Sequence, residues 1–246
     1  MIAIKKHIPN FITCLNLASG TIASIYAFEG QLVYAAFFIL LAAVFDFADG
    51  FMARLLKAYS PMGKELDSLA DIISFGLAPA VIVYTLLKLS IFNSFSLPEL
   101  SLISYPQFIL LFIPVLLAIF SGLRLAKFNV DERQTENFIG LATPANAIFF
   151  ISLPFVLQGG RETWILNPYL LSGLVFLHSF LLVSEIPMFS LKIKSLAWKQ
   201  NQARYLFFII AAVIFGYFGM KGLGLIIWIY VITSILQTLF ERTQRK

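Results

Sequence analysis

Residues 46–71 read DFADGFMARLLKAYSPMGKELDSLAD and place four aspartates, Asp46, Asp49, Asp67 and Asp71, in one short stretch. The whole chain has only 13 acidic residues, so this stretch concentrates negative charge. The residues on both sides of it are apolar. A charged side chain inside a bilayer costs at least about 2.5–3.5 kcal/mol. Four carboxylates in such a setting therefore require a functional explanation.

The rest of the chain has the composition of a membrane protein. Of its 246 residues, 59% are hydrophobic and 13% are charged, and the mean hydropathy is +0.86. Because a helix needs about 20 apolar residues to cross a bilayer, we predict an all-α polytopic membrane protein that forms a single integral membrane domain over residues 1–246. The predicted spans, about eight in number, are residues 9–29, 31–54, 66–88, 105–126, 141–158, 168–187, 203–219 and 222–240.

The N-terminal segment and the cysteine content exclude several alternatives. The first apolar stretch contains Asn10, Thr13 and Asn16 and lacks a small-residue cleavage pattern, so we expect it to remain as a span rather than act as a cleavable signal peptide. Cys14 is the only cysteine. A disulfide framework and a cysteine-based zinc site are therefore excluded.

The distribution of basic residues predicts the orientation. With the N-terminus in the cytoplasm, all but three of the 18 Lys and Arg residues fall on the cytoplasmic side, the exceptions being Lys88, Arg161 and Lys221. By the positive-inside rule, both termini are cytoplasmic. This topology explains the net charge of +5 without nucleic acid as a partner. We expect the protein in a bacterial or archaeal cytoplasmic membrane, with the active site facing the cytoplasm.

Helical spacing predicts how the aspartates are arranged. The second predicted span carries acidic and small residues at i, i+3, i+4 and i+7, which share one helical face: Asp46, Asp49, Gly50 and Ala53. On the next helix, Asp67 and Asp71 are one turn apart, and Gly63 lies one turn before Asp67. A hairpin of the two helices, joined through residues 55–62, brings all four acids together.

Such a cluster favours a bound cation. Neighbouring carboxylates repel one another unless a cation neutralises them, and hard oxygen ligands suit Mg²⁺ or Mn²⁺ better than zinc. Two other interpretations are open: surface ion pairs with Arg54, Lys57 and Lys64, or the ion path of a divalent-cation transporter. Neither explains the small residues, which leave room for a ligand to approach the backbone.

Residues 46–71 match the pattern D-x2-D-G-x2-A-R-x8-G-x3-D-x3-D, and on it the chain resembles the CDP-alcohol phosphotransferases. This resemblance implies that a phosphatidyl group passes from a CDP-linked lipid to a small alcohol. It also implies that two Mg²⁺ or Mn²⁺ ions are held by Asp46, Asp49, Asp67 and Asp71, and that Asp71 is the general base. The implied CDP-binding residues are Asn10, Thr13, Asp49, Gly50, Ala53, Arg54, Gly63 and Asp67. Asn10 and Thr13, with Asn16, can equally serve as contacts between helices.

Four further segments resemble the phosphatidylserine synthase branch of that family: IPNFITCLNLASG at residues 8–20, RLAKFNV at 124–130, GLATPANA at 140–147 and LVSEIPMFSLK at 182–192. This branch implies CDP-diacylglycerol and L-serine as substrates, CMP and phosphatidylserine as products, and a homodimer. Glycerol 3-phosphate, inositol phosphate or a second lipid are the alternative acceptors within the family.

A serine carboxylate needs a cationic partner, and several basic residues lie at cytoplasmic helix ends near the level of the aspartates. Each of these basic residues could instead serve only to orient the protein in the membrane, by the positive-inside rule. The candidate acceptor-binding residues are Arg124, Lys127, Lys192 and Lys194.

Overall fold

The computed structural model describes residues 2–131, 138–160, 163–188 and 198–244. Nearly all of these residues are helical, which confirms the predicted all-α class. The first two helices are α1 (Ile2–Phe28) and α2 (Leu32–Leu55). A continuous rod follows, made of α3 (Pro61–Asp71), the π-helix η1 (Ile72–Leu77) and α4 (Ala78–Phe92).

The remaining elements complete a bundle. They are η2 (Leu100–Leu102), α5 (Tyr105–Phe112), α6 (Val115–Val130), α7 (Thr143–Gln158), η3 (Thr163–Leu166), α8 (Pro168–Val183), α9 (Trp198–Phe218), η4 (Gly219–Gly222) and α10 (Leu223–Gln244). The described residues also contain one short antiparallel pair, β1 (Phe138–Ile139) with β2 (Pro187–Met188). This pair ties the chain before α7 to the chain after α8.

Length and hydropathy identify five membrane-spanning helical segments among the described residues: His7–Phe28, Leu32–Leu55, Pro61–Phe92, Tyr105–Val130 and Arg204–Leu239. The protein is therefore an integral membrane protein. Helices α7 and α8 are apolar but have only 16 residues each, and the last segment combines two predicted spans. The predicted number of eight spans is thus not confirmed.

The third predicted span begins too late. Its helix starts at Pro61, five residues before the predicted residue 66, because Ser60 caps it: the Ser60 side chain accepts a hydrogen bond from the Gly63 N–H at 2.9 Å. Proline suits the first turn of a helix, where its missing N–H is not needed. The connection from α2 is therefore limited to residues 56–60.

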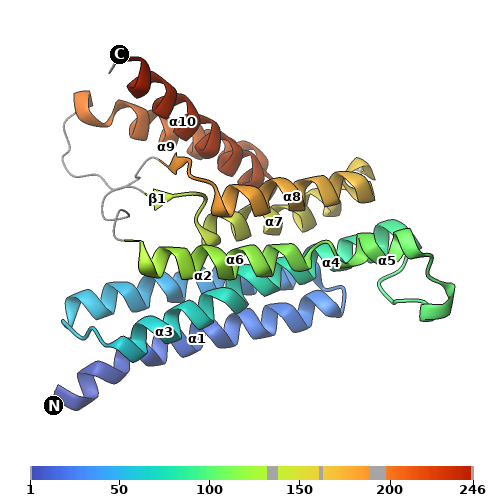
Figure 1. Cartoon of the computed structure of the whole chain (residues 1–246), viewed down its shortest axis with the longest axis horizontal. Coiled ribbons are helices and arrows are strands. Elements are labelled where there is room, and N and C mark those ends of the chain that lie inside the picture. Colours follow the sequence, from blue (N-terminus) through green and yellow to red (C-terminus); the bar gives the residue numbers. More distant parts are fainter. Residues whose placement is uncertain (1, 132–137, 161–162, 189–197, 245–246) are drawn as a thin grey trace.

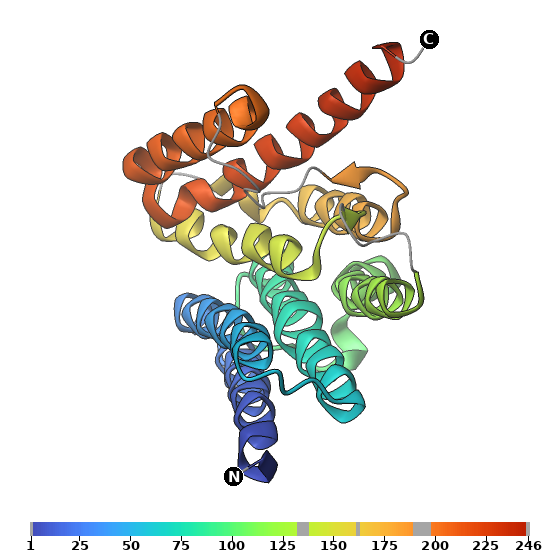
Figure 2. The same ribbon diagram turned by 90° about the vertical axis from the view of Figure 1, so that its left-hand side faces the viewer.

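The rod that carries Asp67 and Asp71 lies at the centre of the bundle. In Figures 1 and 2, α1 and α2 cover one side of it, α6 covers another, and α9 and α10 splay away at the periphery. The most apolar window of Pro61–Phe92 is 72% buried, whereas that of Arg204–Leu239 is 11% buried. The protein thus encloses the part of the rod that follows the acidic helix, whereas α3 itself has only Ala70 and Asp71 buried and the last two helices are mostly uncovered.

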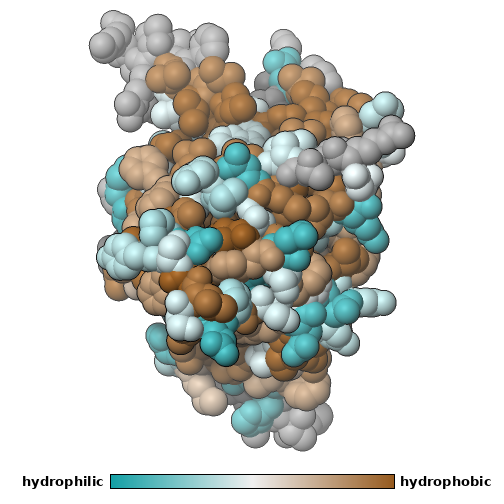
Figure 3. Space-filling view, turned by 90° about the vertical axis from the view of Figure 1, so that its right-hand side faces the viewer, coloured by the Kyte–Doolittle hydropathy of each residue, from teal (hydrophilic) through white to brown (hydrophobic). Residues whose placement is uncertain are grey.

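Helix ends indicate two faces of the molecule. Helix α1 begins and α10 ends at the same end of the bundle, where α2 also passes into α3 (Figure 1). Figure 3 looks onto the opposite end, where hydrophilic residues are scattered over a largely apolar surface. The helix ends therefore fit a common membrane side for both termini, and the cytoplasmic assignment of that side stays a prediction.

Helix α1 contacts the π-helix at backbone distance. A Cβ atom on Gly20 would lie 2.2 Å from the Ser74 Oγ and 2.6 Å from the Ser74 Cα. The Ser74 hydroxyl donates to the Asn16 carbonyl at 3.0 Å. A π-turn inserts an extra residue and is common at functional sites; here it follows Asp71 directly. The contact fixes α1 against the turn that ends the acidic segment.

We expect Gly20→Ala to lower the thermal stability of the detergent-solubilised protein by about 1–3 kcal/mol, because overpacking forces the backbone of η1 away from α1. The matched control is Gly173→Ala in α8, since a Cβ there meets nothing within 4 Å. The control should keep or raise the unfolding midpoint, as alanine is the better helix former. Equal midpoints for the two variants would contradict the close contact.

Candidate active site

Three aspartates converge where α2 and α3 face each other. One carboxylate oxygen from each of Asp46, Asp49 and Asp67 lies within 4.8 Å of the others. Asp49 is buried, and Asp46 and Asp67 are half-buried. The i, i+3 spacing of the two α2 residues and the short loop after α2 produce this convergence. The sequence predicted a cluster of all four aspartates, and Asp71 lies outside this group of three.

This group has the donor set that a divalent ion requires. The Asp49 Oδ2 and Asp67 Oδ1 atoms are buried and accept no hydrogen bond from the described residues. Within the same residues, no ion pair joins the aspartates to Arg54, Lys57 or Lys64. The surface-pairing interpretation is therefore not supported, and the clustered oxygens fit a hard cation.

Asp71 lies one helical turn beyond Asp67 and is not part of this group of three. Its side chain is buried, yet it is near enough to interact electrostatically with Asp46, Asp67 and Asp49. The Asn16 Nδ2 group of α1 donates to the Asp71 Oδ1 atom at 3.4 Å. Asn16 is fully buried, and its own Oδ1 accepts no hydrogen bond from the described residues. The fourth carboxylate is thus oriented by a neutral donor.

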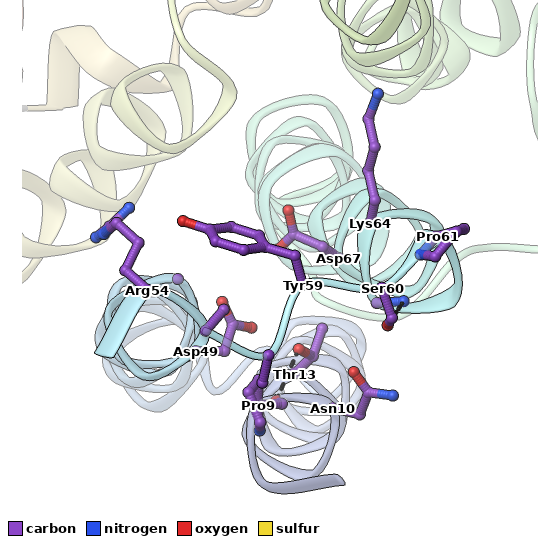
Figure 4. Close-up of a pocket in the computed structure, with 14 residues that line it drawn as sticks. Pro9, Asn10, Thr13, Asp49, Arg54, Tyr59, Ser60, Pro61, Lys64 and Asp67 are labelled. Atoms are coloured by element: carbon purple, nitrogen blue, oxygen red, sulfur yellow. Dashed lines mark hydrogen bonds between the residues drawn. The ribbon is translucent and has the colours of Figure 1, made fainter. Parts of the chain in front are cut away.

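A cavity of about 550 Å³ opens beside the aspartates, between α1, α2, α3 and the connecting loop (Figure 4). Its lining includes all eight residues that the family resemblance assigns to the CDP moiety: Asn10, Thr13, Asp49, Gly50, Ala53, Arg54, Gly63 and Asp67. Six further lining residues were not predicted: Pro9, Ala58, Tyr59, Ser60, Pro61 and Lys64. Apart from Pro9, these residues stand at positions 46–71 where the family pattern allows any amino acid, written x.

Small residues let the walls of the cavity approach closely. A Cβ atom on Gly63 would lie 3.0 Å from both the Asn10 Oδ1 and the Ser60 Oγ. A Cβ atom on Gly50 would lie 3.7 Å from the Arg54 Nη1. A larger residue at position 63 would thus displace either the α1 side chain or the cap of α3. Glycine here shapes the cavity, as the sequence pattern indicated.

The predicted acceptor-binding residues have different surroundings. Arg124 of α6 is buried, its Nε donates to the Leu141 carbonyl at 3.0 Å, and its charge interacts with that of Asp71. Lys127 instead forms an ion pair with Glu185. Lys192 and Lys194 lie outside the described residues. Of the two candidates that the structure describes, Arg124 is the one that lies toward the aspartates.

Helix α6 is also joined directly to α3. The Lys64 Nζ donates to the Asn129 carbonyl at 3.2 Å, and the Asn129 Nδ2 donates to the Ser68 Oγ at 2.9 Å. These bonds fix the helix that carries Arg124 against the helix that carries Asp71. Sequence reasoning gave Asn129 no role, because this contact depends on how the two helices pack.

These features define a polytopic membrane protein whose clustered carboxylates lie beside a cavity at the end of its central helices. The chain belongs to the CDP-alcohol phosphatidyltransferase family, because the sequence model of that family matches residues 6–236. It is therefore a transferase of phospholipid biosynthesis. Enzymes of this family depend on a divalent metal, in agreement with the three clustered carboxylates.

Individual relatives cover most of the chain. The CDP-diacylglycerol–serine O-phosphatidyltransferase of Mycobacterium tuberculosis is 32% identical over 246 residues, covering 97% of this chain and 79% of the relative. The Bacillus subtilis protein of the same name is 32% identical over 181 residues, covering 74% of this chain and 89% of its own. The archaetidylserine synthase of Methanothermobacter thermautotrophicus is 32% identical over 154 residues, covering 62% of this chain and 58% of the relative.

We expect Asp67→Asn to weaken Mn²⁺ binding, measured by isothermal titration calorimetry without substrate. Replacing even an outer partner of a metal ligand costs about 10–100-fold in affinity, so loss of a ligand should cost at least as much. Glu65→Gln is the matched control, because Glu65 is an exposed acid on the same helix. If both variants bound Mn²⁺ as the unmodified protein does, the three carboxylates would not form the metal site.

Proposed function

We propose that this enzyme transfers the phosphatidyl group of CDP-diacylglycerol to L-serine, giving phosphatidylserine and CMP. The observation that carries the proposal is the cluster of Asp46, Asp49 and Asp67, of which Asp49 and Asp67 line a cavity together with the other predicted nucleotide-binding residues. The names of the relatives support serine as the acceptor. The archaeal relative is an archaetidylserine synthase, so its name also points to serine.

The position of the cavity suits a lipid substrate with a polar head. It lies near the end of α2 and the beginning of α3, and α2 exposes apolar side chains there, for example at Phe47 and Phe51. A CDP-lipid can therefore keep its acyl chains in the bilayer while its nucleotide enters the cavity. The basic-residue pattern supports a cytoplasmic position for this end, which stays part of the proposal.

The four aspartates are proposed to hold two divalent ions, Mg²⁺ or Mn²⁺. Asp46, Asp49 and Asp67 supply the closest group of oxygens, and Asp71 lies one turn further along the rod. When bound, such ions neutralise the phosphate oxygens and stabilise the departing CMP. The protein contributes the carboxylate geometry of the site.

Asp71 is proposed as the general base. It takes the proton of the serine hydroxyl as the hydroxyl oxygen forms a bond to the β-phosphorus, and the bond from that phosphorus to CMP breaks. The hydrogen bond from Asn16 holds one carboxylate oxygen. The other oxygen can therefore face the acceptor, provided that it is not fully engaged by metal.

Arg124 is proposed to bind the serine carboxylate. It is buried, it is held through the Leu141 carbonyl, and its charge lies near that of Asp71. A single guanidinium suits one carboxylate, whereas a phosphorylated acceptor would call for a denser cationic cluster. Lys127, Lys192 and Lys194 stay weaker candidates, and the single domain and the homodimer stay predictions.

We expect Asp71→Asn to reduce turnover by about 10²–10⁴-fold, the usual contribution of a general base. The substitution keeps the size and one hydrogen-bonding oxygen, so folding and CMP binding should persist. Turnover is measured as CMP release at saturating substrates, with Glu65→Gln as the control. Activity of Asp71→Asn equal to that of the control would remove Asp71 from the mechanism.

The acceptor is tested by supplying purified enzyme with CDP-diacylglycerol, Mn²⁺ and one alcohol at a time. We expect CMP release with L-serine and only background release with glycerol 3-phosphate or inositol phosphate, because Arg124 can pair with one carboxylate. Arg124→Lys should raise the KM for serine more than it changes kcat. Release with glycerol 3-phosphate but not with serine would contradict the proposed acceptor.

A further inference from the structure

We propose that Tyr59 stacks on the cytosine base of the CDP-lipid and so contributes a nucleotide contact outside the aspartate pattern. The inference rests on the proposed function, because it takes a CDP-linked substrate as the occupant of the cavity. No spacing in residues 46–71 singles out position 59. The assignment comes from where the structure places its ring.

The Tyr59 ring lines the cavity although 70% of the residue is exposed. Figure 4 shows the ring reaching from the α2–α3 loop across the mouth of the cavity toward Arg54, with Asp67 behind it. Among the described aromatic residues, no ring partner is found for Tyr59. One face of a large planar side chain is thus available at the entrance of a site for a planar ligand.

The backbone on both sides of Tyr59 is fixed. The Ala58 N–H donates to the Ala53 carbonyl at 2.9 Å, and the Ala58 side chain is buried. On the other side, Ser60 caps α3 through its bond with the Gly63 N–H. Only the side-chain torsions of Tyr59 are therefore free, and ordering the ring against a base costs little conformational entropy.

The surroundings of the ring match the parts of a nucleotide. Carboxylates lie deeper in the cavity at Asp49 and Asp67, where the metal-bound diphosphate is proposed. The ring lies at the mouth, where the base is furthest from the reacting phosphorus. Stacking of a base on an aromatic face tolerates base identity, so Tyr59 should contribute affinity for the nucleotide rather than choice of base.

The competing role for an exposed tyrosine at a helix end is that of an anchor at the membrane interface. Tyr217 provides the matched control, because it is 82% exposed and lies at the end of α9, away from the residues that line the cavity. An anchor would change stability in the membrane without changing nucleotide affinity. The two roles therefore separate in a binding experiment.

The test is calorimetric titration of the purified protein with CMP and, separately, with ribose 5-phosphate, both in the presence of Mn²⁺. We expect Tyr59→Ala to weaken CMP binding about tenfold or more, given the usual contribution of base stacking. Tyr59→Phe and Tyr59→Trp should bind CMP within about threefold of the unmodified protein, because each keeps an aromatic face. Tyr217→Ala should not change CMP affinity.

Ribose 5-phosphate carries no base, so Tyr59→Ala should bind it as the unmodified protein does. The proposal is overturned if Tyr59→Ala binds CMP normally, if it loses both ligands equally, or if Tyr59→Phe is as weak as Tyr59→Ala. Retained Mn²⁺ binding shows that each variant is folded. Failure of the unmodified protein to bind CMP would instead contradict the proposed function, and the role of Tyr59 with it.

Discussion

Negative charge in a medium of low dielectric constant is the constraint on which the rest of this structure depends. Asp49 and Asp71 are buried within apolar helices, and Asp46 and Asp67 are close to them. Four such groups are costly unless cations or hydrogen-bond donors offset them. The described residues provide Asn16 as a donor to Asp71 but no ion-pair partner for the aspartates. Bound metal ions would therefore stabilise these side chains more than any contact within the described part of the chain does.

Helix packing serves this constraint. Gly20 lets α1 touch the π-helix that follows Asp71, and Gly63 lets α1 approach α3 at the wall of the cavity. The bonds between Lys64, Asn129 and Ser68 hold α6 against α3 on the other side. Helix α3 is thus in contact with α1 on one side and α6 on the other, and these contacts hold its carboxylates in place before substrate binds. Preorganisation of this kind is what electrostatic catalysis requires.

The sequence predicted those features that depend on local periodicity. The shared face of Asp46 and Asp49 follows from helical spacing, whereas the eight lining residues were named as candidates for CDP binding on the family resemblance. Sequence reasoning placed the start of the third helix too late because it did not weigh the cap formed by Ser60. It could not foresee the π-turn or the different surroundings of Arg124 and Lys127, since these depend on contacts between distant segments. Tyr59 carries no spacing signal and is recognised only from its place at the cavity mouth.

Metal binding by the clustered carboxylates is the central claim, and anomalous diffraction tests it most directly. Crystals of the enzyme grown with Mn²⁺ and CMP would be measured for manganese anomalous signal. The account predicts a peak at about 2.1 Å from oxygens of Asp46, Asp49 and Asp67, the distance typical of hard octahedral ions. Well-ordered CMP in the cavity with no anomalous peak at these three side chains would contradict it.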